Sequence, residues 1–336
     1  MNGRLTATGL LQAAATLACA ATIVSYLAAY GWAFDLTTHF RPHYVLVLAV
    51  GALACAIDRR WSMAAAFGGF AALNVAPVVP LYVAATPASM PAPFVRLMLL
   101  NVFSDRCPPE ALVGEIARHD PDVLLLLEVD PQWQAYLAAG LATYPHRVTD
   151  FRSDAFGIAL LSKTDLVEAQ VLTLGAADLP AVQAQLTVGG QSMTVLGVHA
   201  PPPIGPRMAH LRDQYLREVG ARLPDVERPL VVLGDLNASY WSVAFQELVT
   251  EHELRNTAIG WGLQGTWPSW SPVRVPIDHA LVSPDLFVAR RAVGARGCSD
   301  HLPLVVDLAS DDSRIAAGRG SEPSSSGWPW PPVRIE

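Results

Sequence analysis

Long apolar runs fill the first ninety residues of the chain. No side chain between Arg4 and Asp35 is charged, and a helix rises about 1.5 Å per residue, so this run can cross a hydrocarbon core of about 30 Å. Two further uncharged runs follow, and the middle run of the three is the shortest. We therefore expect a membrane anchor over residues 1–90, with three transmembrane helices at 5–29, 42–57 and 61–83.

Two alternatives stay open for this region. Arg4 and Ala18-Cys19-Ala20 resemble the start and the cleavage site of a signal peptide, although the apolar run continues well past that site.

Arg4 and Arg59-Arg60 lie on one side of the predicted anchor and Arg41 on the other. This bias places the N-terminus on the cytoplasmic side of a bacterial cytoplasmic membrane, and three spans then put the chain after residue 90 in the periplasm or outside the cell. If residues 42–57 do not cross, the rest of the chain is cytoplasmic instead.

The pattern changes at residue 95, where short apolar runs bounded by polar residues begin. Such runs are typical of buried strands, and apolar residues at helical spacing indicate helices. The expected strands lie at residues 95–102, 123–129, 156–162, 181–188, 192–199, 230–233, 277–282 and 302–308, and the expected helices at 110–119 and 207–222. Many strands with few long helices predict an α/β domain over residues 95–309, in which packed sheets are flanked by helices.

The segments on either side of this domain have a different composition. A proline-spaced linker over residues 87–94 precedes it. A tail over residues 310–336, rich in Gly, Ser and Pro, follows it, and we expect this tail to be disordered.

Charge separates the chain into the same two parts. Residues 1–94 carry four basic and two acidic side chains, a net of +2, and the remaining 242 residues carry 19 and 28, a net of −9. The acidic part contains a single lysine, Lys163, which excludes a basic protein that coats nucleic acid. A mean hydropathy of +0.30 is too high for an ordinary soluble enzyme. Cys107 and Cys298 could pair in an oxidising compartment, but we expect unpaired thiols.

Polar residues stand at the ends of several predicted strands. They occur in Leu99-Leu-Asn-Val102, Leu127-Glu-Val129, Gly197-Val-His-Ala-Pro201, Leu233-Gly-Asp-Leu-Asn-Ala238, Pro276-Ile-Asp-His279 and Ser299-Asp-His-Leu-Pro303. Any one of these can be a cap or a turn former. Six together predict a functional site, because an α/β scaffold presents its reactive groups at strand ends.

With these motifs the sequence resembles the endonuclease/exonuclease/phosphatase superfamily, the metal-dependent phosphohydrolases that include DNase I-like nucleases, inositol-phosphate phosphatases and neutral sphingomyelinases. The resemblance covers residues 95–309, and its most specific parts are Gly234-Asp235-x-Asn237 and Ser299-Asp300-His301. It implies a four-layer α/β sandwich of two packed sheets flanked by helices. The anchor ahead of such a domain is similar to that of bacterial membrane-bound members.

The resemblance also implies a metal site. Phosphoester hydrolysis needs the charge on the phosphate oxygens neutralised and a water activated, and hard oxygen ligands suit Mg²⁺ or Mn²⁺. Glu128 is the expected main ligand, with Asn101 beside it and Asp300 completing the metal environment. In many family nucleases an acidic or amide residue follows two positions after the asparagine, whereas Phe103 stands there in this chain. A second metal is therefore in doubt.

The catalytic roles follow from the same resemblance and from the chemistry of the side chains. His301 is expected to be the general base or the electrostatic partner of the scissile phosphate, oriented by Asp278. Asp235 would position or deprotonate the attacking water, Asn237 would donate to a phosphate or leaving oxygen, and His199 would hydrogen-bond the phosphate. His279 is expected to be a structural neighbour.

The sequence leaves the substrate open. A phosphodiester or phosphomonoester is expected, and a lipid headgroup is favoured slightly because the anchor places the site near a bilayer. Trp261, Trp267 and Trp270 precede Asp278 in a loop that could touch an apolar substrate or could simply pack. A membrane-tethered nuclease is the alternative. A non-catalytic scaffold is less favoured, because all the expected catalytic residues are present. No stable protein partner is inferred.

Overall fold

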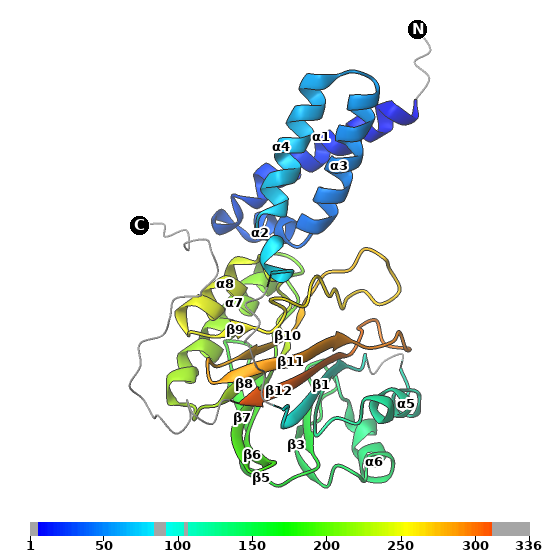
Figure 1. Ribbon diagram of the computed structural model, residues 1–336. Coiled ribbons are helices and arrows are strands. Elements are labelled where there is room, and N and C mark those ends of the chain that lie inside the picture. Colours follow the sequence, from blue (N-terminus) through cyan, green and yellow to red (C-terminus); the bar gives the residue numbers. More distant parts are fainter. Residues whose placement is uncertain (1–5, 84–91, 104–106, 311–336) are drawn as a thin grey trace.

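A computed structural model describes residues 6–83, 92–103 and 107–310. It shows a bundle of helices next to a domain built of strands and helices (Figure 1). Most of the predicted linker and tail lie outside the described residues, apart from residues 92–94 and from Ser310, which ends the last strand.

The bundle is formed by helices that contact one another through small side chains. A Cβ added to Gly51 would lie 2.5 Å from Cβ of Ala15, so glycine permits the close approach of two of the helices. The large apolar side chains of Leu17, Leu46 and Leu53 stay exposed. The elements are α1 (Ala7–Ser25), the 3₁₀ turn η1 (Ala28–Tyr30), α2 (Trp32–Thr38), α3 (Arg41–Ile57), α4 (Trp61–Val75) and η2 (Val79–Leu81).

The expectation of three transmembrane helices is not met. By length and composition one helix of the described residues, α1, could cross a membrane, or two segments if α2 and α3, which meet at an angle of 63°, are one bent span. Helix α4 is apolar but ends at Val75. Counting uncharged residues overestimated the helices, because Pro77 and Pro80 lack the N–H groups that would continue α4.

Two six-stranded sheets form the second part of the chain. The first has the order β11-β12-β1-β2-β4-β3 and the second the order β5-β6-β7-β8-β10-β9. The first sheet contains β11 (Leu286–Val293), β12 (Leu304–Ser310), β1 (Val95–Asn101), β2 (Val123–Leu127), β4 (Ile158–Ser162) and β3 (His146–Asp150). The second contains β5 (Leu166–Leu174), β6 (Leu179–Val188), β7 (Gln191–His199), β8 (Leu230–Asp235), β10 (Asp278–Val282) and β9 (Arg255–Asn256).

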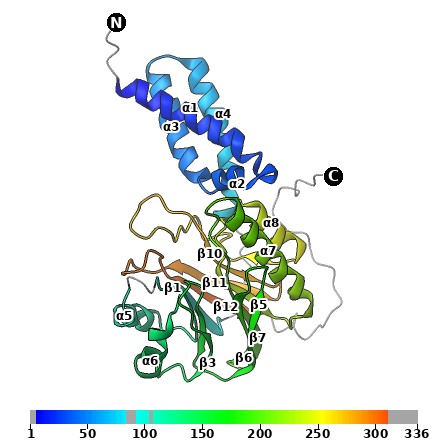
Figure 2. The same cartoon turned by 180° about the vertical axis from the view of Figure 1, so that it is seen from behind.

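Three apolar layers hold this domain together. Alternate residues of both sheets, such as Leu125 and Val195, form the core between the sheets. The other face of the first sheet packs on α5 (Glu110–His119) and α6 (Pro131–Gly140), and that of the second sheet packs on α7 (Pro206–Arg222) and α8 (Val243–Glu251). The expected four-layer α/β sandwich is therefore confirmed (Figures 1 and 2).

All the strands and both helices expected from the sequence are present, with shifts of a few residues at their ends. Four strands and two helices were not expected. Of these, β5 exposes most of its residues and β9 has only two, so neither produces a run of apolar residues. The missed elements are β3, β5, β9, β11, α6 and α8.

Candidate active site

Two parallel strand pairs bring the predicted residues to one edge of the sandwich. In the first sheet β1 runs parallel to β2, so that Asn101 pairs with Leu127, the residue before Glu128. In the second sheet β7 runs parallel to β8, and His199 pairs with Asp235. Because the carboxyl ends of parallel strands meet at one edge, the four polar side chains lie at matching positions of the two sheets.

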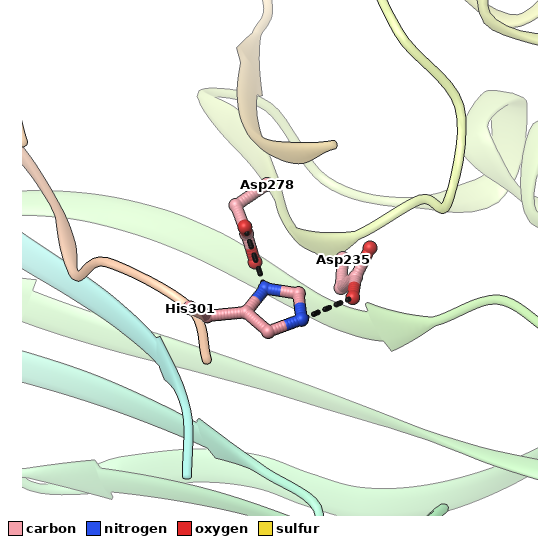
Figure 3. A group of neighbouring side chains, drawn as sticks. All are labelled: Asp235, Asp278 and His301. Carbon is pink, nitrogen blue, oxygen red and sulfur yellow. Dashed lines mark hydrogen bonds and ion pairs between the residues drawn. The ribbon is translucent and has the colours of Figure 1, made fainter. Parts of the chain in front are cut away.

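The centre of the site is a buried group of Asp235, Asp278 and His301 (Figure 3). Asp278 begins β10 and pairs directly with Asp235 on the antiparallel strand β8. Nδ1 of His301 lies 2.9 Å from Oδ2 of Asp278, and its Nε2 lies 3.8 Å from Oδ2 of Asp235. The histidine that the sequence expected Asp278 to orient is therefore in contact with it, although 23 residues separate the two.

Hydrogen bonds from the backbone fix the loop that carries His301. The backbone N–H of His301 donates to Oγ of Ser299 at 3.0 Å, and this hydroxyl donates to the carbonyl of Asn101 at 2.6 Å. The loop before β12 is thus tied to the end of β1. Ser299 was quoted in a sequence motif but given no role, and its place next to the aspartate–histidine pair was its only signal.

Burial and neighbouring charges shift the pKa values of Asp235, Asp278 and His301 in different directions. Burial raises the pKa of Asp235 well above its ordinary value, and the negative charge of Asp278 adds to this. Burial alone would lower the pKa of His301, but Asp278 and Asp235 outweigh it and raise that pKa to about 10. Burial likewise opposes ionisation of Asp278, yet the charge and hydrogen bond of His301 keep its pKa below the ordinary value. The His301–Asp278 pair is therefore ionic, and Asp235 faces it.

His199 and Asn237 lie against Asp235. Nε2 of His199 is 3.9 Å from Oδ2 of Asp235, and burial, with the charge of His301, lowers the pKa of His199 to about 3. The backbone N–H of Asn237 donates to Oδ1 of Asp235 at 2.9 Å, and its side-chain amide donates to the carbonyl of Ala200 at the same distance. A neutral imidazole and a fixed amide thus flank one carboxylate.

Asn101 and Glu128 form a second group, which we call the outer pair. Nδ2 of Asn101 donates to Oε1 of Glu128 at 2.8 Å, and Oδ1 of Asn101 accepts from the N–H of Phe103 at 3.1 Å. Glu128 is only half-buried. Its φ is 61°, and φ is also positive at Phe103 and Asn237. Left-handed backbone at three residues after strand ends is strain of the kind that collects at functional sites.

Asp300 and His279 form hydrogen bonds to groups outside the buried cluster. Oδ2 of Asp300 accepts from Nε1 of Trp267 at 3.0 Å, and the charge of Asp300 helps to raise the pKa of His301. Nε2 of His279 donates to the carbonyl of Ala238 at 2.7 Å. This contact ties the imidazole of His279 to the backbone of the loop after β8.

The donor set fits a divalent cation. Ligand atoms of Asp235, Asp278 and His301 lie within 4.8 Å of one another, and Oδ1 of Asp278 is buried with no hydrogen-bond partner among the described residues. The negative charge of Glu128 also acts on Asp235 and contributes to its raised pKa. Two buried carboxylates next to each other, with a third near enough for its charge to act on one of them, favour a cation, and hard oxygen donors suit Mg²⁺ or Mn²⁺.

The expectation of unpaired thiols at Cys107 and Cys298 is wrong. The two residues form a disulfide, with Cα atoms 5.2 Å apart and 191 positions between them in the sequence. They meet because β1 and β12 are neighbouring antiparallel strands, so the loop after Asn101 lies beside the loop before β12. The bond links the segment after Asn101 to the segment that carries His301.

A family model matches the part of the chain that forms the two sheets. The model of the endonuclease/exonuclease/phosphatase family matches residues 98–301, which is more than half of the chain and includes every candidate residue. A search of curated proteins found no match.

Solved structures give the same fold. An endonuclease/exonuclease/phosphatase from Beutenbergia cavernae DSM 12333 is 22% identical over 65% of this chain and 72% of its own, with a TM-score of 0.52. The human Nocturnin catalytic domain with bound sulfate is 21% identical over 66% and 97%, with a TM-score of 0.54. D. rerio TDP2, in complex with a single-strand DNA product, is 17% identical over 64% and 99%, with a TM-score of 0.53. This chain belongs to the endonuclease/exonuclease/phosphatase family.

Proposed function

We propose that the protein is a membrane-anchored, divalent-metal-dependent phosphoesterase. One observation carries the proposal: Asp235, Asp278, His301 and His199 meet in one buried group, and that group lies at the same edge of the sandwich as Asn101 and Glu128. Membership of a family of nucleases and phosphatases supports a phosphoester as the substrate.

The side chains divide the work of hydrolysis among them. Asp278 holds Nδ1 of His301, so Nε2 faces the site as the electrostatic partner of the scissile phosphate. Asp235 lies within 4 Å of both imidazoles and is placed to orient a water and take its proton. Asn237 and His199 donate to phosphate oxygens as the charge on them grows.

Glu128 would hold the cation, with the buried Asn101 beside it and Asp300 nearby, because the half-buried carboxylate of Glu128 supplies oxygen donors close to the buried carboxylate of Asp235. When bound, Mg²⁺ or Mn²⁺ supplies Lewis-acid polarisation of the phosphoryl oxygens. Glu128 is prepared for this role by the hydrogen bond from Asn101, which fixes one of its oxygens.

The helical bundle supports a membrane location. Helix α1 is long and apolar enough to cross a bilayer, and α3 exposes Leu46, Leu53 and Ile57. The N-terminal end of α1 points away from the catalytic domain in both views (Figures 1 and 2). With Arg4 inside, a single crossing by α1 would put the catalytic domain outside the cytoplasmic membrane.

A lipid headgroup is the substrate that we favour. Trp270 is 65% exposed and Val273 47% exposed, so the loop between β9 and β10 does not simply pack against the domain. This loop projects from the end of the domain that lies next to the helical bundle (Figures 1 and 2). Exposed apolar side chains near a membrane favour contact with lipid. The DNA product in the TDP2 structure supports the second candidate, a membrane-tethered nuclease.

The test uses the full chain in detergent micelles with Mg²⁺ or Mn²⁺. The panel is bis(p-nitrophenyl) phosphate, phospholipid vesicles, single-stranded DNA and RNA. We expect turnover that EDTA and His301→Ala abolish and that His146→Ala, a histidine on the edge strand β3, leaves unchanged. Preference within the panel decides between lipid and nucleic acid. A folded, metal-binding protein that hydrolyses nothing would contradict the proposal and favour a scaffold.

A further inference from the structure

Asp35 is a buried carboxylate that the catalytic chemistry does not use. It lies in α2 and is 3% exposed, although it is one of only two acidic residues before residue 95. Its partners come from the catalytic domain, about 200 positions away in the sequence. Oδ2 accepts from Nη2 of Arg212 at 3.0 Å and from Oγ of Ser242 at 2.9 Å, and Oδ1 accepts from the N–H of Val243 at 2.9 Å.

These bonds make Asp35 the cap of a helix in the other part of the molecule. Val243 is the first residue of α8, and its N–H is one of those that a helix cannot pair internally. Ser242 stands at the N-cap but makes no side-chain cap bond of its own, and it donates to Asp35 instead. The carboxylate therefore sits where an anion stabilises a helix N-terminus.

Arg212 connects Asp35 to the active site. Its side chain is 2% exposed, and Nη1 donates to the carbonyl of Asn237 at 3.3 Å, while Nη2 holds Asp35. Asn237 in turn bonds Asp235 through its backbone N–H. Its φ of 48° is left-handed, a conformation that asparagine tolerates better than most residues, and the bonds from Arg212 and to Asp235 fix its backbone there.

A second contact from the helical bundle reaches the same loop. Nε1 of Trp241 donates to the carbonyl of Pro77, which follows α4, at 2.9 Å. Leu81 of η2 packs in the core beneath α7 and α8. The loop from Asn237 to Ser242 is therefore held at both ends by residues outside the two sheets.

We propose that Asp35 is a positioning residue of the active site, acting through Arg212 and the α8 cap to set the place of Asn237. The inference rests on the proposed function. The helical bundle then contributes to catalysis as well as to anchoring, because it supplies the cap that helix α8 lacks in the catalytic domain alone.

The test compares Asp35→Asn with Asp58→Asn in the full chain in detergent micelles. Asp58 is the other acidic residue of the bundle, and it is exposed at the end of α3. We expect Asp35→Asn to lower kcat about 10- to 100-fold with little change in KM, because small displacements of a catalytic group have effects of this size. Asp58→Asn should leave both unchanged.

A double-mutant cycle separates positioning from general destabilisation. If Asp35 acts through Asn237, then Asp35→Asn should cause little further loss of kcat in a chain that already carries Asn237→Ala. Purely structural damage would instead multiply the two losses. Unchanged kcat in Asp35→Asn, or full additivity in the cycle, would overturn the inference.

Two further measurements cover the remaining outcomes. Should Asp35→Asn fail to fold, Trp241→Phe removes the bond to Pro77 together with part of the buried indole, and it should lower kcat about three- to fivefold. Should the wild type hydrolyse nothing, the proposed function fails, and hydrogen exchange of residues 236–243 then decides the inference alone. Asp35→Asn should speed exchange in that peptide and Asp58→Asn should not, and equal exchange in both would overturn it.

Discussion

The two halves of the active site differ in burial. The buried cluster of His199, Asp235, Asp278 and His301 is at most 5% exposed at each residue, whereas Glu128 and Asp300 are half-buried. Asn101 of the outer pair is buried, so the contrast rests on the two half-buried carboxylates. In the cluster, protein partners fix an ion pair in a place where charge interactions are strong. At the outer pair, a carboxylate meets solvent, from which a cation can bind. In the proposed mechanism, the cluster orients groups and moves protons, while Glu128 of the outer pair binds the metal.

The largest expected effect comes from breaking the buried cluster with Asp278→Asn. The amide keeps the shape but cannot hold the imidazolium, so turnover should fall about 10³-fold, within the range known for acid–base groups and their orienting carboxylates. The control is Asp165→Asn, which breaks a surface pair with His146 at 3.1 Å and should change nothing. Steady-state kinetics on bis(p-nitrophenyl) phosphate measure both, and equal rates would refute a special role for the buried pair.

The same variant gives a pH test with a definite sign. The pKa of His301 is raised to about 10 from an ordinary 6.5, so its contribution to stability is complete below about pH 6.5 and is lost as the pH rises through 10. Asp278→Asn should lower this pKa and abolish the loss. Nitrogen NMR of the imidazole in EDTA, with urea unfolding at pH 8 and pH 10.5, measures both quantities.

The disulfide joins the segments that carry the two halves, and its removal should have the next largest effect. The bond between Cys107 and Cys298 should stabilise the fold by about 2–4 kcal/mol, the range typical of a disulfide, although loop entropy alone would give about 5 kcal/mol for so long a loop. We expect Cys107→Ser with Cys298→Ser to lower the free energy of urea unfolding by this amount. A reducing agent should destabilise the wild type equally and leave the double variant unaffected. Insensitivity of the wild type to reduction would contradict the bond.

Much of the fold could be predicted from the sequence because the central strands are buried on both faces. Leu124 to Leu127 form an unbroken apolar run, and Asn101 and Asp235 end similar runs. The elements that were not predicted lack such runs. The edge strand β5 exposes most of its residues, and helix α8 begins at a cap supplied by Asp35, 208 positions away. No local pattern contains such a cap.

The sequence motifs named the residues of the candidate site, but they did not show which other parts of the chain contact it. Motifs at strand ends identified all the residues that meet at Asp235. Arg212 was overlooked, because an arginine in an amphipathic helix is normally a solvated side chain and only the fold shows it to be buried. Counting uncharged residues likewise could not show that α4 ends before its prolines.

A smaller effect is expected at the outer pair. Glu128→Gln keeps the hydrogen bond to Asn101 within reach but removes a charge, so turnover should fall about 10²-fold and the Mg²⁺ concentration at half-maximal rate should rise at least about tenfold. Glu227→Gln, on an exposed residue, is the control. An unchanged metal requirement would assign the cation to Asp235, Asp278 and His301 instead, and the contrast between the two halves would disappear.

The smallest effect is expected in the loop between β9 and β10, which carries Trp267 and Trp270 and contacts Asp300. Trp267 donates to Asp300, while Trp270, three residues on, is 65% exposed and makes no such hydrogen bond within the described part of the chain. Trp270→Ser should therefore leave turnover of bis(p-nitrophenyl) phosphate unchanged, because it removes no group near the buried cluster. On phospholipid vesicles it should raise KM about threefold, since losing one indole removes about 1 kcal/mol or less of contact with lipid. Ser271→Ala in the same loop is the control. An equal loss on both substrates would mean that the loop supports the site itself, and no loss on either would separate the loop from substrate and favour the nuclease.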